Sequence, residues 1–509
     1  MKTNIYSKSL IALAVIMMLS SCKDLFNKDD IQKNPNSPLQ SQVDVSQLTT
    51  AAMLGMSLLY EDTDNRIASI WGGHLAGTSR QHLTFQNYIV SSTSFGWFNY
   101  YNSAVNARYA QAAAISKAQK GVNQVMEALI FHKMAALWGA VPYTEAMDLV
   151  NHPTPKYDDQ AAVYGSLITL LDNAVVNLQA GGGIVGDFIF GNPGNGYIGD
   201  ASKWIAAART LQARMYLHTK QYAKAVTAAQ QGISNPLNDM LVPHGTSQQV
   251  DLNLNYDFFV NSRPGDTAFD PSLGSYLPAF MCTDISVGTV GTLGVAKRNA
   301  KTNETGIFNA FFGYENVQSG DGTWDPNVTN GVFQANSSSP ILTYYENQLI
   351  LAEAAQRLAN TPAAVDPTAL AALNSVRAGL QTGVIFGGKY SSLGTLTYTP
   401  YVAADFTATG NGGTGVANPS TGPYAGMNEQ TAFLREVASQ KFIVLLMQFE
   451  AFTELRRLAV LSPAISLGVP INTGSKYPAR YIYPQNEINT NPNTPSPAPD
   501  QFTKLDLFK

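Results

Sequence analysis

The chain has 509 residues, of which 45% are hydrophobic and 13% are charged, so it can bury a substantial core beneath a surface that is poor in charge. Its formal net charge of −4 speaks against a nucleic-acid partner, because proteins that bind nucleic acid need a basic surface. The two cysteines, Cys22 and Cys282, are too few for a disulfide framework.

The first 22 residues have the pattern of a bacterial lipoprotein signal peptide. Two lysines precede an uninterrupted apolar stretch at residues 10–19, and the sequence Leu-Ser-Ser-Cys then ends at Cys22. This stretch is shorter than the roughly 20 residues that span a bilayer. The pattern predicts removal of residues 1–21, a lipid on Cys22, and a polar tether over residues 22–45. An ordinary secretory signal with a chance cysteine is the alternative.

The chain from about residue 46 to 235 has mainly helical spacing. Between residues 122 and 138, apolar side chains recur every three or four positions, which predicts one apolar helix face. Other helices are predicted at about 159–178, 201–218, 221–233, 341–359, 366–379 and 429–461. A faint tetratricopeptide-repeat pattern between Tyr216 and Pro236 favours stacked helix pairs.

Two stretches interrupt this helical pattern, at about 238–340 and 382–428. They are rich in Gly, Pro, Asn and Thr, and they lack helical periodicity. Long loops on a rigid scaffold are usually functional or mobile. We therefore predict a single domain over residues 46–509 with two long loop excursions.

The sequence contains neither an HExxH metal motif nor a GxSxG nucleophile motif. Glu450 and Glu454 lie one helical turn apart, so their carboxylates share a helix face, and a glycosidase needs two carboxylates about 5–10 Å apart. Lys441, Arg456 and Arg457 are close by in sequence, so a structural ion-pair network is the favoured interpretation. No catalytic residue is predicted.

Three acidic residues, Asp257, Asp266 and Asp270, have oxygen atoms that suit a hard cation. Their spacing is not that of a calcium-binding loop. We therefore predict no metal site and no cofactor.

Several sequence blocks occur in a defined order between residues 137 and 487. They are LWGAVPYTEA at 137–146, PKYDDQ at 155–160, DFIFG at 187–191 followed by Trp204, LAEA at 351–354, LNSVR at 373–377, FEAFTELRR at 449–457 and YPQNE at 483–487. Together they resemble the SusD/RagB-like nutrient-binding lipoproteins of Bacteroidetes, in the SusD-like branch associated with starch binding. Ala140 and Phe452 depart from the family pattern, which usually has an acid or Asn and a Trp there.

The resemblance implies a mostly α fold, with a tetratricopeptide-like scaffold of helix pairs beside a loop-rich, irregular half. It also implies a protein on the outer face of the outer membrane that captures an oligosaccharide or a peptide. Such a protein delivers its ligand to a SusC-like, TonB-dependent transporter and catalyses no reaction. Two alternatives stay open, a structural partner subunit that binds no ligand and a lipid-anchored glycosidase.

Aromatic rings that stack on a ligand are expected in the loops around residues 66–100 and 308–330. Trp71 stands beside two glycines and precedes a polar run at residues 78–82, and Trp324 lies in a turn-rich loop near Tyr314. We therefore predict Trp71, Tyr314 and Trp324 as ligand-binding residues.

Overall fold

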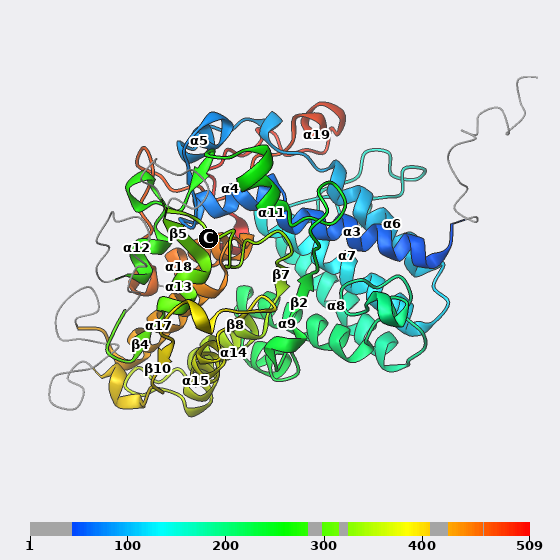
Figure 1. Ribbon diagram of the computed structural model, residues 1–509. Coiled ribbons are helices and arrows are strands. Elements are labelled where there is room, and N and C mark those ends of the chain that lie inside the picture. Colours follow the sequence, from blue (N-terminus) through cyan, green and yellow to red (C-terminus); the bar gives the residue numbers. More distant parts are fainter. Residues whose placement is uncertain (1–42, 283–297, 315–323, 408–425, 462, 509) are drawn as a thin grey trace, which may run out of the picture.

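The computed structural model describes residues 43–282, 298–314, 324–407, 426–461 and 463–508. The predicted signal peptide, Cys22 and most of the predicted tether lie outside the described residues. Figure 1 shows most of the long helices on one side of the molecule and most of the short helices, strands and loops on the other. This arrangement confirms the prediction of a mostly α fold with a loop-rich half.

The long helices pack side by side in chain order, each against the next. They are α3 (Val45–Glu61), α6 (Phe98–Ala112), α7 (Lys117–Trp138), α8 (Gln160–Gln179), α9 (Ala201–His218), α10 (Tyr222–Ala229), α14 (Tyr344–Ala359) and α15 (Pro367–Gln381). Each helix buries an apolar stripe against its neighbours, which is how repeated helix pairs build a continuous core. The predicted helix-pair scaffold is therefore present.

Helix α7 lies at the centre of this array, between α6 and α8. Its N-terminus is capped by Ser116, whose hydroxyl accepts a hydrogen bond from the Gln119 amide at 3.0 Å. It ends at Gly139, which has a φ of 82° that favours glycine. Packing on several sides explains why nearly all of the α7 side chains are buried, including polar ones.

One predicted helix, at 429–461, is wrong, because the structure has two helices there, α17 (Glu429–Val444) and α18 (Phe449–Leu461). Between them Met447 has a left-handed φ of 56°. The side chain of Asn65, in α4 (Thr63–Trp71), hydrogen-bonds to the Met447 carbonyl and to the Phe449 amide. His74 accepts a further hydrogen bond from the Met447 amide at 3.2 Å. The break between α17 and α18 is therefore stabilised by residues almost 400 positions away in sequence.

The irregular half contains short two-stranded antiparallel sheets. The pairs are β1 (Ala76–Gly77) with β3 (Thr267–Ala268), β2 (Met240–Val242) with β7 (Ser339–Leu342), β4 (Thr302–Asn303) with β10 (Thr397–Tyr398), β5 (Phe312–Tyr314) with β6 (Trp324–Pro326), and β8 (Val384–Ile385) with β9 (Gly388–Lys389). Short helices accompany them: α5 (Arg80–Gln86), α11 (Leu254–Tyr256), α12 (Leu277–Met281), α13 (Thr305–Phe311) and α19 (Gln485–Thr490).

Helix α8 is the one helix of the described residues that is long and apolar enough to cross a membrane. It packs between α7 and α9, and its inner face, with Val163, Leu167 and Leu171, is buried there. We therefore interpret α8 as a helix of the packed array.

Candidate functional site

A groove of about 680 Å³ lies between helix α3 and two loop segments, residues 186–197 and residues 242–254. Its volume is within the range of about 300–1,000 Å³ that is typical of ligand pockets. We call it the α3 groove. It is open to solvent and lies where the helical array meets the irregular half.

Helix α3 forms the floor of the groove. One face of the helix is fully buried against α6 and α7, through Met53, Met56 and Leu59. On another face Leu54 and Leu58, one turn apart, line the groove and keep 53% and 44% of their surface exposed. Exposed leucines at this spacing form an apolar strip that a ligand can cover.

The first wall, residues 186–197, is held in place by the buried carboxylate of Asp187. It accepts hydrogen bonds from the Ile189 and Phe190 amides at 2.9 and 3.0 Å and from the Trp204 indole at 2.6 Å. Burial raises the pKa of Asp187, and these donors only partly offset that effect. Asp187 and Trp204 therefore fix the loop that carries Phe188 and Tyr197 to the groove.

This wall also contacts the floor directly. Thr50 of α3 donates a hydrogen bond to the Gly186 carbonyl at 3.0 Å. Gly186 has a φ of 71°, and a Cβ atom there would lie 2.4 Å from the Ser46 carbonyl oxygen. The close approach of the loop to the helix therefore requires glycine.

The second wall is the loop of residues 242–254, and hydrogen bonds to Asp251 fix its conformation. The Asp251 carbonyl accepts from the Gly245 amide at 2.8 Å, and the Asp251 side chain accepts from the Ser247 amide at 2.8 Å. Asn253 anchors the end of the loop by donating to the Ser337 carbonyl at 2.8 Å. The loop presents Val250, which is 82% exposed, to the mouth of the groove.

The inner end of the groove is polar. Glu61, the last residue of α3, is buried, and its Oε1 lies 2.8 Å from Nε2 of His244. The same oxygen accepts a hydrogen bond from the Ser339 hydroxyl of β7. Nδ1 of His244 faces the Asp251 carbonyl at 3.2 Å. The groove therefore combines an apolar floor with a carboxylate at one end.

Trp71 is not at this groove, and its prediction as a ligand-binding residue is wrong. It is 1% exposed, and its indole donates a hydrogen bond to the Phe85 carbonyl at 3.0 Å. Its ring packs edge-on against Tyr88, Phe452 and Tyr481, with centroids 5.3–6.3 Å apart. The rings that surround Trp71 leave no face for a ligand.

Trp324 is also a core residue, so its predicted role in stacking on a ligand is wrong. It is 3% exposed and packs against Phe308, with ring centroids 5.3 Å apart. The turn-rich sequence around it pairs as strand β6 with β5, and Tyr314 is its register partner. The side chain of Tyr314 lies outside the described part of the structure, so its role stays a prediction.

Glu450 and Glu454 are buried in an ion-pair network, as predicted. Glu454 binds Lys441 at 2.8 Å and Arg457 at 2.6 Å, and both cations also bind Glu353 at 2.7 Å. The Arg456 guanidinium donates to main-chain carbonyls, at 2.8 Å for Ala479 and 2.9 Å for Ala136.

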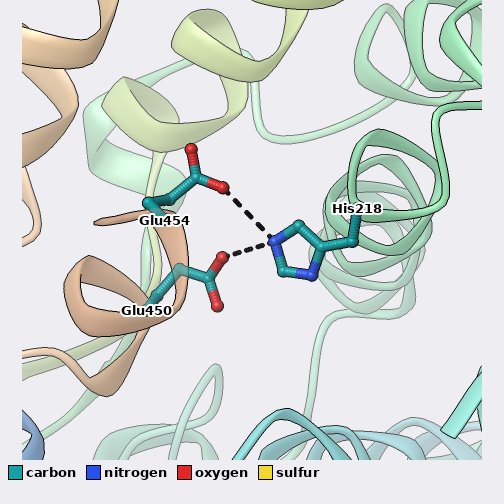
Figure 2. A group of neighbouring side chains, drawn as sticks. All are labelled: His218, Glu450 and Glu454. Carbon is teal, nitrogen blue, oxygen red and sulfur yellow. Dashed lines mark hydrogen bonds and ion pairs between the residues drawn. The ribbon is translucent and has the colours of Figure 1, made fainter. Parts of the chain in front are cut away.

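His218 completes this network, as Figure 2 shows. Its Nε2 lies 2.8 Å from Glu450 and 3.4 Å from Glu454, both on α18. Burial lowers the pKa of His218, but the Glu450 and Glu454 carboxylates together outweigh burial, so its pKa is raised. The three side chains have the donor atoms for a metal ion. However, Lys441 and Arg457 already pair with Glu454, and Arg214 lies 3.9 Å from Glu450, so we assign the cluster a structural role.

The three acidic residues considered for a cation each have local partners. Asp266 binds Arg80 at 2.6 Å and His82 at 3.2 Å. Asp270 accepts from the Ser272 amide at 2.7 Å and caps a short helical turn. Asp257 accepts from the Asn261 amide group at 3.0 Å. These contacts account for the carboxylates without a metal.

The α3 groove was not predicted from the sequence. One signal was available, because the segment 45–61 has apolar residues on more than one helix face. The two walls are irregular segments, and the DFIFG block in the first wall does not itself indicate a groove. Their approach to α3 depends on contacts such as Thr50 to Gly186, which join residues 136 positions apart.

The profile of a SusD-like family, described as starch-binding and associating with the outer membrane, matches residues 35–484. The chain therefore belongs to the SusD-like family. No curated protein matches the chain.

Solved structures of SusD-like proteins share its fold. A SusD/RagB family protein of Bacteroides thetaiotaomicron is 21% identical, with a TM-score of 0.60, and the match covers 89% of this chain and 95% of that one. A SusD homologue of Bacteroides fragilis is 15% identical, with a TM-score of 0.60 and coverage of 92% and 100%. A chitin-binding SusD homologue of Flavobacterium johnsoniae is 16% identical, with a TM-score of 0.58 and coverage of 90% and 98%.

Proposed function

We propose that this protein is a lipid-anchored, surface-exposed binding protein that captures an oligosaccharide or a peptide and delivers it to a SusC-like, TonB-dependent outer-membrane transporter. Family membership and the lipoprotein signal support this proposal. The observation that carries the binding role is the α3 groove, which is of ligand size, apolar along its floor and polar at its inner end. A structural subunit that binds no ligand is the alternative.

Binding is expected to depend on the floor of the α3 groove. Intact protein is titrated by calorimetry with chito-oligosaccharides, malto-oligosaccharides and a tryptic digest of casein. We expect at least one probe to bind, and Leu58→Asp to weaken its binding at least about tenfold, because the substitution removes apolar contact and adds charge. Leu149→Asp, on a side chain that is 76% exposed and does not line the groove, is the matched control. A folded protein that binds no probe would support the alternative.

The lipid anchor is expected to depend on Cys22. Replacing it by Ser removes the thiol that is acylated, so Cys22→Ser should move the protein from the membrane fraction to the soluble fraction. Cys282→Ser is the control, because Cys282 lies in the folded part of the chain and should not affect fractionation. Immunoblots of separated fractions measure this, and an outer-membrane-bound Cys22→Ser variant would contradict the anchor.

A further inference from the structure

The lining of the α3 groove is mostly apolar. Its floor and mouth have Leu54, Leu58 and Val250 exposed, and its first wall adds the rings of Phe188 and Tyr197. Each sugar hydroxyl that enters such a groove loses its water and needs a polar partner, or binding is weakened. Aliphatic side chains of a ligand would meet no such penalty.

The inner end has polar atoms whose hydrogen-bonding capacity is unused. Oε1 of Glu61 has two partners, but Oε2 has none among the described residues. Ser57, one helical turn earlier, is 2% exposed, and its hydroxyl likewise has no partner within the described part of the chain. Both residues line the groove. Buried polar groups normally have partners, so the Ser57 hydroxyl indicates a missing partner, and the unused oxygen of Glu61 can accept a hydrogen bond from a ligand.

The charge of the residues that line the groove indicates which kind of hydrogen-bond donor a ligand would bring. Among the described residues that line the groove none is Lys or Arg, whereas Glu61 and Asp251 are acidic. His244 supplies at most one positive charge, so the lining is negative in either of its protonation states. Arg66 lies behind Glu61 and donates to its main-chain carbonyl at 2.9 Å, and it does not line the groove. A positively charged group on the ligand therefore complements the inner end.

We infer that the α3 groove binds a short peptide whose aliphatic side chains cover Leu54 and Leu58 and whose ammonium or guanidinium group meets Glu61 and Ser57. This inference rests on the proposed binding function and names the class of ligand. Glu61 is then the residue that selects a basic ligand over a neutral one.

Two blocked tetrapeptides, acetyl-LLKL-amide and acetyl-LLQL-amide, test this selection in calorimetric titrations of the intact protein. We expect the lysine peptide to bind about tenfold more tightly, which is the ratio that one hydrogen bond to a charged group supplies. Glu61→Gln keeps the shape of the side chain and should reduce the ratio to below about twofold. Asp172→Asn, which removes one exposed carboxylate that does not line the groove, should leave the ratio unchanged.

Other results would overturn the inference. Equal affinities for the two peptides, a preference that survives Glu61→Gln, or binding of oligosaccharides but not of either peptide would each do so. In the last case the proposed binding function would stand. If neither peptides nor oligosaccharides bind the folded protein, both the inference and the binding function fail. Thermal unfolding of Glu61→Gln verifies that the variant is folded.

Discussion

Arg457→Met is expected to lower the free energy of unfolding by about 3–5 kcal/mol, the usual cost of removing one partner from a buried ion pair. The guanidinium is buried and donates to Glu353 at 2.7 Å and to Glu454 at 2.6 Å. Burial alone would raise the pKa of Glu353, but Arg457 and Lys441 outweigh it and hold the pKa low. Without Arg457, the two carboxylates would face each other with one shared lysine. Urea unfolding followed by circular dichroism measures the change.

Arg209→Met is the matched control for this substitution. Arg209 also faces a carboxylate, Asp172, at 3.4 Å, but the Asp172 side chain is 57% exposed. Exposed ion pairs contribute about 0–1 kcal/mol, so this variant should unfold almost as the wild type does. Equal losses for the two variants would show that burial does not determine the strength of the network.

Trp71→Ala is expected to destabilise the protein by a similar amount, about 3–5 kcal/mol, because it leaves a large cavity in the aromatic core. Tyr88, Phe452 and Tyr481 would each lose their contact with the indole, and the Phe85 carbonyl would lose its donor. The affinity of the folded fraction for any ligand of the α3 groove should be unchanged, since Trp71 does not line it. Urea unfolding and a calorimetric titration measure the two effects.

Phe98→Ala serves as the control for the loss of an aromatic ring. Phe98 is 79% exposed at the start of α6, so its removal should change the free energy of unfolding by no more than about 0.5 kcal/mol. A Trp71→Ala variant of wild-type stability that has lost ligand binding would restore the prediction of a ligand-stacking tryptophan.

The helices of this protein are largely determined by local sequence. Apolar spacing predicted a helix at 201–218, and α9 runs from Ala201 to His218. The same holds for the ion pair of Glu454 with Arg457, three positions away on the same helix, whereas Glu450 pairs with His218, 232 positions away. Helical periodicity and i,i+3 or i,i+4 pairing act over one or two turns, so a sequence displays them directly.

Tertiary structure alone decided which aromatic rings are buried, where the 429–461 helix breaks, and where the groove forms. Trp71 is buried by Phe452 and Tyr481, about 400 positions away, and Met447 turns because Asn65 and His74 bind its main chain. The α3 groove needs three segments that are separate in sequence. Whether a side chain is buried, and where a groove forms, depends on which distant segments pack together. The turn residues beside Trp324 and the glycines beside Trp71 carry no information about that packing.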